Sequence, residues 1–257
     1  MHSKDYDILE QLISRSRLST YKKQFHTTNP LTITSMYIWN AKLSENFYFL
    51  LQNLEVSLRN SIYEAFRQSF PNQSFFHLNE ANIKKTYIKR LEYHSAACWK
   101  MICKVKANLE EENITLSDGK IIAELNFGFW TTLLRQKHYR NKMWRPILST
   151  AFPYYPFSKS QSCDLRHISE KIDTIRLFRN RIFHYEPIFN HDNLHAIHRD
   201  MIEVLGWISP ELQKLSLAFD EFDDIVYSKK KINKKLQRLY ATNRYNKTHL
   251  MKKRNHQ

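Results

Sequence analysis

Glycine is nearly absent from this chain, and its scarcity limits the folds open to it. Gly119, Gly128 and Gly206 are the only glycines among 257 residues. Sheets joined by tight turns need residues with positive φ, a conformation that glycine adopts most readily. The same scarcity excludes glycine-rich phosphate loops and dinucleotide-binding fingerprints. We therefore predict an all-α protein in which a few loops join the helices.

Apolar side chains recur at helical spacing in several segments of the chain. One apolar face covers residues 38–70, and Pro71 closes that segment. The other expected helices span residues 83–112, 118–138, 162–185, 191–208 and 210–227. Because neither an internal repeat nor a low-complexity linker divides them, we predict one helical domain over residues 1–227 with a C-terminal extension.

Positive charge gathers in that extension. The formal net charge is +15, yet residues 228–257 hold eleven Lys or Arg and no Asp or Glu, which leaves 29 basic and 25 acidic side chains in residues 1–227. Such a tail favours phosphate-rich partners through counterion release, or it simply keeps the protein in solution. We predict a tail that is partly helical or disordered. Its candidate RNA-binding residues are Lys229, Lys230, Lys231, Lys234, Lys235 and Arg238.

The remaining composition predicts a cytoplasmic protein that holds no cofactor. Three cysteines form no disulfide framework, the N-terminus lacks the apolar segment of a signal peptide, and no run of 18 apolar residues suggests a membrane span. Three histidines lie close together in the sequence, but they lack the cysteine grouping or the H-E-x-x-H pattern of zinc sites, so we predict no metal. These histidines are His191, His195 and His198.

One helical segment places charge where its pattern reserves a position for an apolar side chain. Between residues 162 and 185, apolar residues recur in steps of three and four, except at Arg179. Asn180 and His184 stand four residues apart and share a face of an ideal helix. Arginine neutralises a phosphate and its transition state, and histidine moves protons, so the group suits metal-independent phosphodiester chemistry. The spacing alone is not specific, because Arg244 and His249 repeat it.

The segment FRNRIFHYEP, residues 178–187, resembles the R-N-x-x-x-H motif of HEPN domains, in particular that of the Abi-like proteins of bacterial abortive-infection systems (the AbiD/AbiF group). Similar segments follow in the same order between about residues 11 and 215. LISRSRLSTYKKQF resembles the family's opening, and YIWNAKLSENFYFLLQNLEVSLRNSIYEAF resembles its Tyr-x-Trp-Asn and Leu-Glu-x-x-Leu-Arg-Asn blocks. ELNFGFWTTLLR is similar to its Phe-Gly-x-Trp block, and HAIHRDMIEVLGWISPEL to the segment after the motif.

This resemblance implies a HEPN-like helical bundle with additional helices. It also implies a metal-independent endoribonuclease that serves as an abortive-infection (phage defence) or toxin–antitoxin effector. Arg179 would bind the scissile phosphate, His184 would act as general acid or base, and Asn180 would orient both groups. The attacking 2′-hydroxyl of the RNA would leave a 2′,3′-cyclic phosphate and a 5′-hydroxyl. The resemblance further implies a homodimer with a composite active site and a restraining antitoxin protein or small RNA.

The matched Leu-Glu-x-x-Leu-Arg-Asn block contributes three further candidates, Glu55, Arg59 and Asn60, which could support the site. Glu55 and Arg59 also suit an ordinary i,i+4 ion pair. Two alternatives remain open. One is a non-catalytic RNA-binding protein whose basic tail docks a regulatory or structured RNA. The other is a protein-interaction module in which Arg179 and His184 are a half-buried arginine and a helix-capping histidine.

Overall fold

The structure is a computed structural model that describes residues 1, 3–73, 75–76, 96–136, 139, 143–191 and 193–254. In this part of the chain all regular elements are helices and no residue lies in a strand, which confirms the all-α prediction. In chain order the helices are α1 (Ser3–Ile13), α2 (Arg15–Gln24), α3 (Pro30–Ser69), α4 (Ala96–Glu111), α5 (Asp118–Glu124), α6 (Phe127–Arg135), α7 (Arg145–Ala151), α8 (Gln161–Phe183), α9 (Leu194–Ile208), α10 (Pro210–Ala218), α11 (Phe222–Val226) and α12 (Lys229–Arg254). Among them, no helix combines the length and the apolarity that crossing a membrane requires.

Contacts within the chain divide it into two compact units. The first unit contains Met1–Tyr48, His184–Asp192 and Asp220–Gln257, and the second contains Phe49–Phe183 and Asn193–Phe219. Helix α3 therefore contributes its first half to one unit and its second half to the other. The single domain over residues 1–227 stays a prediction, because a division of contacts does not decide whether the units fold independently.

Helix α3 begins well before residue 38, where the apolar pattern placed its start. The side-chain oxygen of Asn29 accepts a hydrogen bond from the backbone N–H of Thr32 at 3.1 Å, and Pro30 is the first helical residue. Asparagine is a preferred N-cap residue. Proline suits the first helical position because the N–H that it lacks would have no partner within the helix there. The dipeptide Asn-Pro was thus the start signal.

Two other predicted helices are each divided into two shorter ones. Residues 118–138 form α5 and α6, because the side chain of Asn126 accepts a hydrogen bond from Phe129 N–H and starts a new helix. Residues 210–227 form α10 and α11, and Asp220 accepts from Phe222 N–H between them. Residues 83–95 of the predicted helix 83–112 lie outside the described residues, and α4 covers the rest to Glu111.

The first unit has an aromatic core. The ring of Phe189 lies 5.2 Å from that of Tyr21, 5.0 Å from that of Phe25 and 6.0 Å from that of Trp39. The indole N–H of Trp39 donates a hydrogen bond to the carbonyl oxygen of Ile225 at 2.9 Å. The buried indole of Trp39 therefore has a hydrogen-bond partner for its N–H, as buried indoles usually do. Helices α2, α3 and α11 and the segment after α8 therefore share one core.

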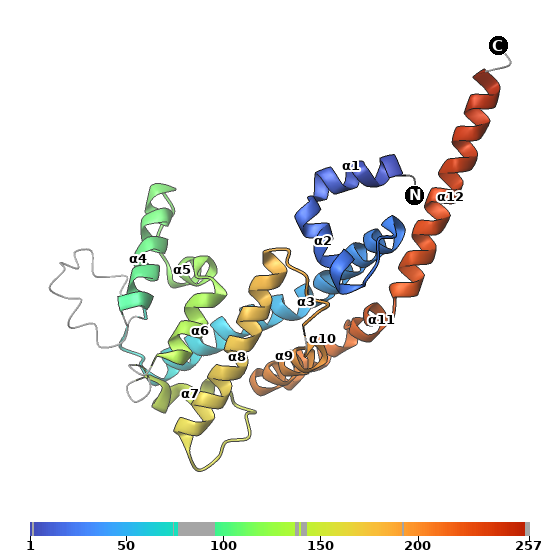
Figure 1. Ribbon diagram of the computed structural model, residues 1–257. Helices are drawn as coiled ribbons and strands as arrows, with labels where there is room; N and C mark the ends of the chain where they lie inside the picture. The colour runs from blue at the N-terminus through green and yellow to red at the C-terminus, as the bar shows by residue number, and fades with distance from the viewer. Residues whose placement is uncertain are drawn as a thin grey trace. The chain divides into compact units, whose positions relative to one another are not determined.

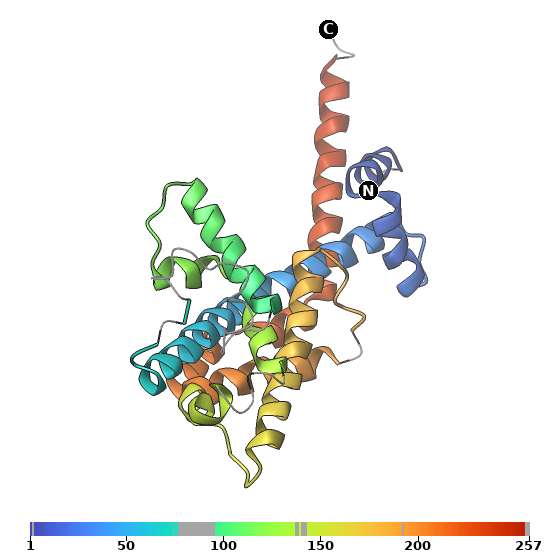
Figure 2. The ribbon, with the colours of Figure 1, turned by 90° about the vertical axis from the view of Figure 1, so that its left-hand side faces the viewer.

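The second unit is built around α8. Helices α6 and α9 both pack against α8, and α10 packs against α9 (Figures 1 and 2). The predicted apolar stripe of α8 is buried as the spacing required. Its members are Leu165, Ile168, Ile172, Ile175 and Ile182. Because α8 is held along this stripe, the side chains at its C-terminal end have a fixed support.

Candidate functional site

Arg179 occupies the gap in the apolar stripe of α8. Its side chain is only 24% exposed, and its Nη2 lies 3.6 Å from Oε2 of Glu55. The guanidinium also lies over the ring of Phe183, with 4.0 Å between its central carbon and the ring centroid. A planar guanidinium is suited both to stacking on an aromatic ring and to binding a carboxylate or phosphate. Arg179 is thus held on two sides, toward the C-terminal end of its helix.

Glu55 takes a different partner from the one its spacing predicted. The expected i,i+4 ion pair with Arg59 is wrong, since in the described chain Glu55 pairs with Arg179 of α8. An i,i+4 pair on a helix surface contributes only about 0.2–0.5 kcal/mol. Because such a pair is this weak, a guanidinium from another helix can replace Arg59 as the partner of Glu55 at little cost to α3. The structure therefore brings one predicted supporting residue, Glu55, to the predicted phosphate-binding residue.

Asn180 and His184 lie on either side of the end of α8. Asn180 is half-buried within the helix, whereas His184 is exposed in the turn that follows Phe183. The prediction that His184 sits in the last helical turn is wrong by one residue. The reason is Tyr185, whose φ of 55° is left-handed and ends the helical path. Arg17 donates a hydrogen bond to the carbonyl oxygen of Tyr185.

The segment that begins with His184 is anchored by a residue that sequence reasoning did not single out. Asn40 of α3 is 6% exposed, and its side-chain oxygen accepts from the backbone N–H of Ile188 at 2.8 Å and of Phe189 at 3.3 Å. Together with the aromatic core around Phe189, this contact holds the loop to the first half of α3. The Tyr-x-Trp-Asn block was the available signal, because Trp39 and Asn40 are its last two members.

Arg59 and Asn60, the other supporting candidates, differ in exposure. Asn60 is exposed. Arg59 is half-buried, and its Nε is buried without a hydrogen-bond partner. No ion pair joins Arg59 to any carboxylate of the described chain, whereas Arg67 of the same helix pairs with Glu64 at 3.2 Å. The structure thus leaves Arg59 without the carboxylate that the sequence had assigned to it.

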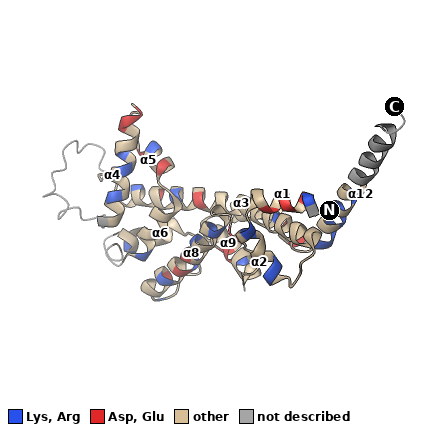
Figure 3. Cartoon of the chain, turned by 45° about the horizontal axis from the view of Figure 1, so that its top comes forward, with Lys and Arg blue, Asp and Glu red and all other residues tan. Residues whose placement is uncertain are grey.

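The basic extension is helical from its start. In α12, which belongs to the first unit, Leu236 is buried and Ile232 is half-buried. Lys and Arg side chains occur along the first turns of the helix (Figure 3). Lys229 lies over the ring of Trp39, with its Nζ 4.1 Å from the centroid. The other predicted RNA-binding residues, Lys230, Lys231, Lys234, Lys235 and Arg238, are exposed.

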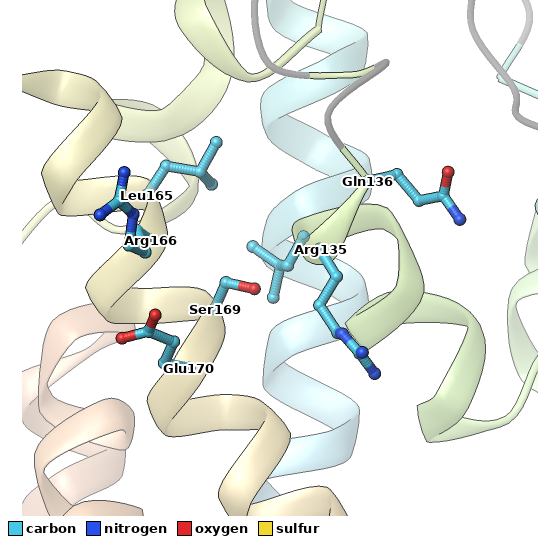
Figure 4. Close-up of a pocket in the computed structure, with 7 residues that line it drawn as sticks. Arg135, Gln136, Leu165, Arg166, Ser169 and Glu170 are labelled. Carbon is cyan, nitrogen blue, oxygen red and sulfur yellow. The ribbon is translucent and has the colours of Figure 1, made fainter.

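A hollow of about 180 Å³ lies between α6 and α8, away from the motif (Figure 4). Ser169 is turned toward it from α8, and Arg135 borders it from α6. Arg135 is already paired with Asp173 at 3.3 Å, and the lining also holds one further residue of each charge, Arg166 and Glu170. Because the charges balance and the motif residues are not in its lining, this hollow is not the candidate site.

Neither metal coordination nor comparison with known proteins adds residues to the site. Within the described ranges, no three His, Cys, Asp or Glu side chains lie close enough together to hold a metal ion. Comparison of the chain with protein-family models, with curated proteins and with solved structures gives no match. The case for function therefore depends on the residues themselves.

Proposed function

We propose that this protein is a metal-independent endoribonuclease of the HEPN type, used as an abortive-infection or toxin–antitoxin effector. One observation supports it most. Arg179 interrupts a buried apolar stripe, and its guanidinium lies beside the Glu55 carboxylate and over the Phe183 ring, close to the end of α8. A half-buried arginine positioned in this way and followed five residues later by an exposed histidine suits the binding and cleavage of a phosphodiester.

The proposed reaction uses the RNA's own 2′-hydroxyl as nucleophile. Its oxygen attacks the adjacent phosphorus while the bond from phosphorus to the 5′-oxygen of the next nucleotide breaks. A base accepts the 2′-hydroxyl proton, an acid supplies a proton to the leaving oxygen, and His184 serves in one of these roles. Arg179 neutralises the phosphate as its charge grows in the transition state, and Asn180 orients the two groups. The products are a 2′,3′-cyclic phosphate and a 5′-hydroxyl.

In this proposal two copies of the chain form one composite site. Arg179 lies within α8, whereas His184 lies beyond the last helical residue, Phe183, so the two side chains do not project from one helical face. A second protomer resolves this if it supplies one of the two residues. Mixing inactive Arg179→Ala and His184→Ala proteins would then restore cleavage in mixed dimers. Mixtures that stay as inactive as their components would contradict the composite site.

A second candidate function is RNA binding without catalysis. It is favoured by α12, in which Leu236 is buried while five basic side chains are exposed. These are Lys230, Lys231, Lys234, Lys235 and Arg238. Such a surface binds phosphates without reading sequence, and its affinity falls steeply with salt. The bound partner would be a regulatory or structured RNA. This function predicts salt-sensitive binding and no cleavage products.

The first experiment compares wild type, His184→Ala and His249→Ala, each confirmed folded by circular dichroism. The three proteins are incubated with end-labelled RNA in excess EDTA, and the product ends are mapped. His249→Ala is a matched control, because Arg244 and His249 have the same spacing as Arg179 and His184. Cyclic-phosphate products from wild type and His249→Ala, but not from His184→Ala, are expected. RNA that stays intact while a gel shift shows binding would favour the second candidate.

A further inference from the structure

Arg59 carries a charge that the described chain leaves unbalanced. Its Nε is buried and has no hydrogen-bond partner, and no carboxylate lies within ion-pair distance of it in the part of the chain that the structure describes. By contrast, Arg67 on the same helix pairs with Glu64 at 3.2 Å, and Arg176 of α8 pairs with Asp173 at 2.7 Å. Buried donors in native proteins nearly always have a partner, so an orphan such as Arg59 calls for an explanation.

The position of Arg59 relates it to Arg179. Arg59 follows Glu55 by four residues and so lies on the same face of α3, one turn or about 6 Å further along the helix. Glu55 is the residue of that face that contacts Arg179 of α8. The Nε of Arg179 is likewise buried without a hydrogen-bond partner. Glu55 thus pairs with Arg179 alone and leaves Arg59 without a carboxylate, and a bound anion would balance the charge of Arg59.

We propose that Arg59 is a phosphate-binding residue that holds a phosphodiester next to the one bound by Arg179. This inference rests on the proposed function, since it takes the anion to be part of an RNA chain. The ligand class is an oligonucleotide with at least two phosphodiester groups. Arginine suits this role because its donors remain charged at any physiological pH and match phosphate oxygens in pairs.

The test measures binding in a background that cannot cleave. His184→Ala protein is titrated into a fluorescently labelled single-stranded oligonucleotide at several salt concentrations in excess EDTA. Each phosphate contact with a single strand contributes about 0.7 to the slope of log affinity against log salt. Adding Arg59→Gln is expected to lower that slope by about 0.7 and to weaken binding. Adding Arg67→Gln, which removes a paired arginine from the same helix, is expected to leave the slope unchanged.

Further variants separate phosphate binding from a structural role. Arg59→Lys keeps the charge and is expected to retain most of the slope that Arg59→Gln loses. Circular dichroism melts accompany every titration. The proposal is overturned if Arg59→Gln has the same slope as the His184→Ala background. It is also overturned if Arg59→Gln and Arg67→Gln lower the slope equally. If Arg59→Gln unfolds, Arg59→Lys together with Arg59→Met decides the outcome by the same comparison of slopes.

Failure of this proposal is distinguishable from failure of the proposed function. If wild type does not cleave RNA but Arg59→Gln lowers the slope, the phosphate-binding role of Arg59 is supported and the ribonuclease proposal is contradicted. If wild type cleaves RNA but Arg59→Gln leaves the slope unchanged, the ribonuclease proposal is supported and the phosphate-binding role of Arg59 is contradicted. The binding and cleavage assays therefore report on the two proposals separately.

Discussion

The side-chain oxygen of Asn40 accepts a hydrogen bond from the backbone N–H of Ile188 at 2.8 Å, across 148 residues of sequence. The same oxygen accepts from the N–H of Phe189 at 3.3 Å. Two backbone donors, one of them buried, therefore depend on one side chain. Because these donors follow His184 by only a few residues, Asn40 fixes the course of the chain beyond the proposed catalytic histidine.

Replacement of Asn40 is expected to destabilise the protein. Asn40→Ala leaves a buried backbone donor unpaired, which costs about 1–3 kcal/mol, and urea unfolding measures that loss. Asn40→Asp retains the accepting oxygen and is expected to lose less. The Asn60→Ala variant is a control, because Asn60 lies on the same helix and is exposed. An Asn40→Ala protein as stable as the Asn60→Ala protein would contradict this account.

Glu55→Gln tests whether the ion pair orients Arg179 for catalysis. Without the carboxylate, the guanidinium of Arg179 keeps only its contact with the Phe183 ring. We expect cleavage to slow by about 10- to 100-fold, because a misplaced catalytic group lowers the rate to that extent. Binding of RNA is expected to strengthen slightly, since a competing negative charge is gone. The measurements are single-turnover cleavage and affinity on the same RNA. Glu64→Gln, which breaks the Arg67 pair on the same helix, should leave cleavage unchanged. Equal effects of the two variants would count against a positioning role for Glu55.

The sequence predicted the helices well where their apolar faces were regular and poorly where a polar side chain set a boundary. The stripe from Leu165 to Ile182 is buried as expected, because helical period and burial are directly related. The division of residues 118–138 was missed, because Asn126 also suits a helix interior or a loop until its contact with Phe129 N–H is known. Capping residues are common, and only the surrounding packing selects those that act.

The candidate site was predictable as a set of residues but not as a set of contacts. An arginine in an apolar position is visible in the sequence, and so Arg179 was found. The partner of Glu55 was not, since spacing along α3 favours Arg59 and only the packing of α8 brings Arg179 within 3.6 Å. The role of Asn40 depends on a contact across 148 residues, and periodicity within one helix holds no information on such contacts.

Tyr185 is expected to be a position where glycine stabilises the protein. Its φ of 55° is left-handed, a conformation that costs a side-chain-bearing residue about 1–2 kcal/mol and glycine very little. The side chain is 76% exposed, so its loss removes little packing. Tyr185→Gly should therefore raise the urea midpoint of unfolding, while Tyr185→Ala should not. A Tyr185→Gly protein less stable than the Tyr185→Ala protein would show that the ring contributes more than the backbone strain costs.

Lys171 is expected to make stability depend on pH in the alkaline range. Its ammonium lies 2.7 Å from Oδ1 of Asp200 and 2.5 Å from Oε2 of Glu203, and only 15% of its side chain is exposed. Partial burial alone would lower the pKa of Lys171, but the hydrogen bonds to the two carboxylates outweigh burial and raise that pKa above its usual 10.5. A raised pKa means that the folded protein holds this proton more tightly than the unfolded chain does.

The contribution of Lys171 to stability is therefore complete below pH 10.5 and is lost as the pH rises through the raised pKa. Lys171→Met keeps most of the aliphatic stem beside Trp207 but removes the charge, and it should destabilise the protein by about 1–2 kcal/mol at neutral pH. Urea unfolding of both proteins between about pH 7 and about pH 11 measures the difference between their free energies of unfolding. That difference should stay constant up to about pH 10 and narrow above it, because wild type alone loses the charge. A difference that narrows below about pH 9 would show that the carboxylates do not raise the pKa of Lys171.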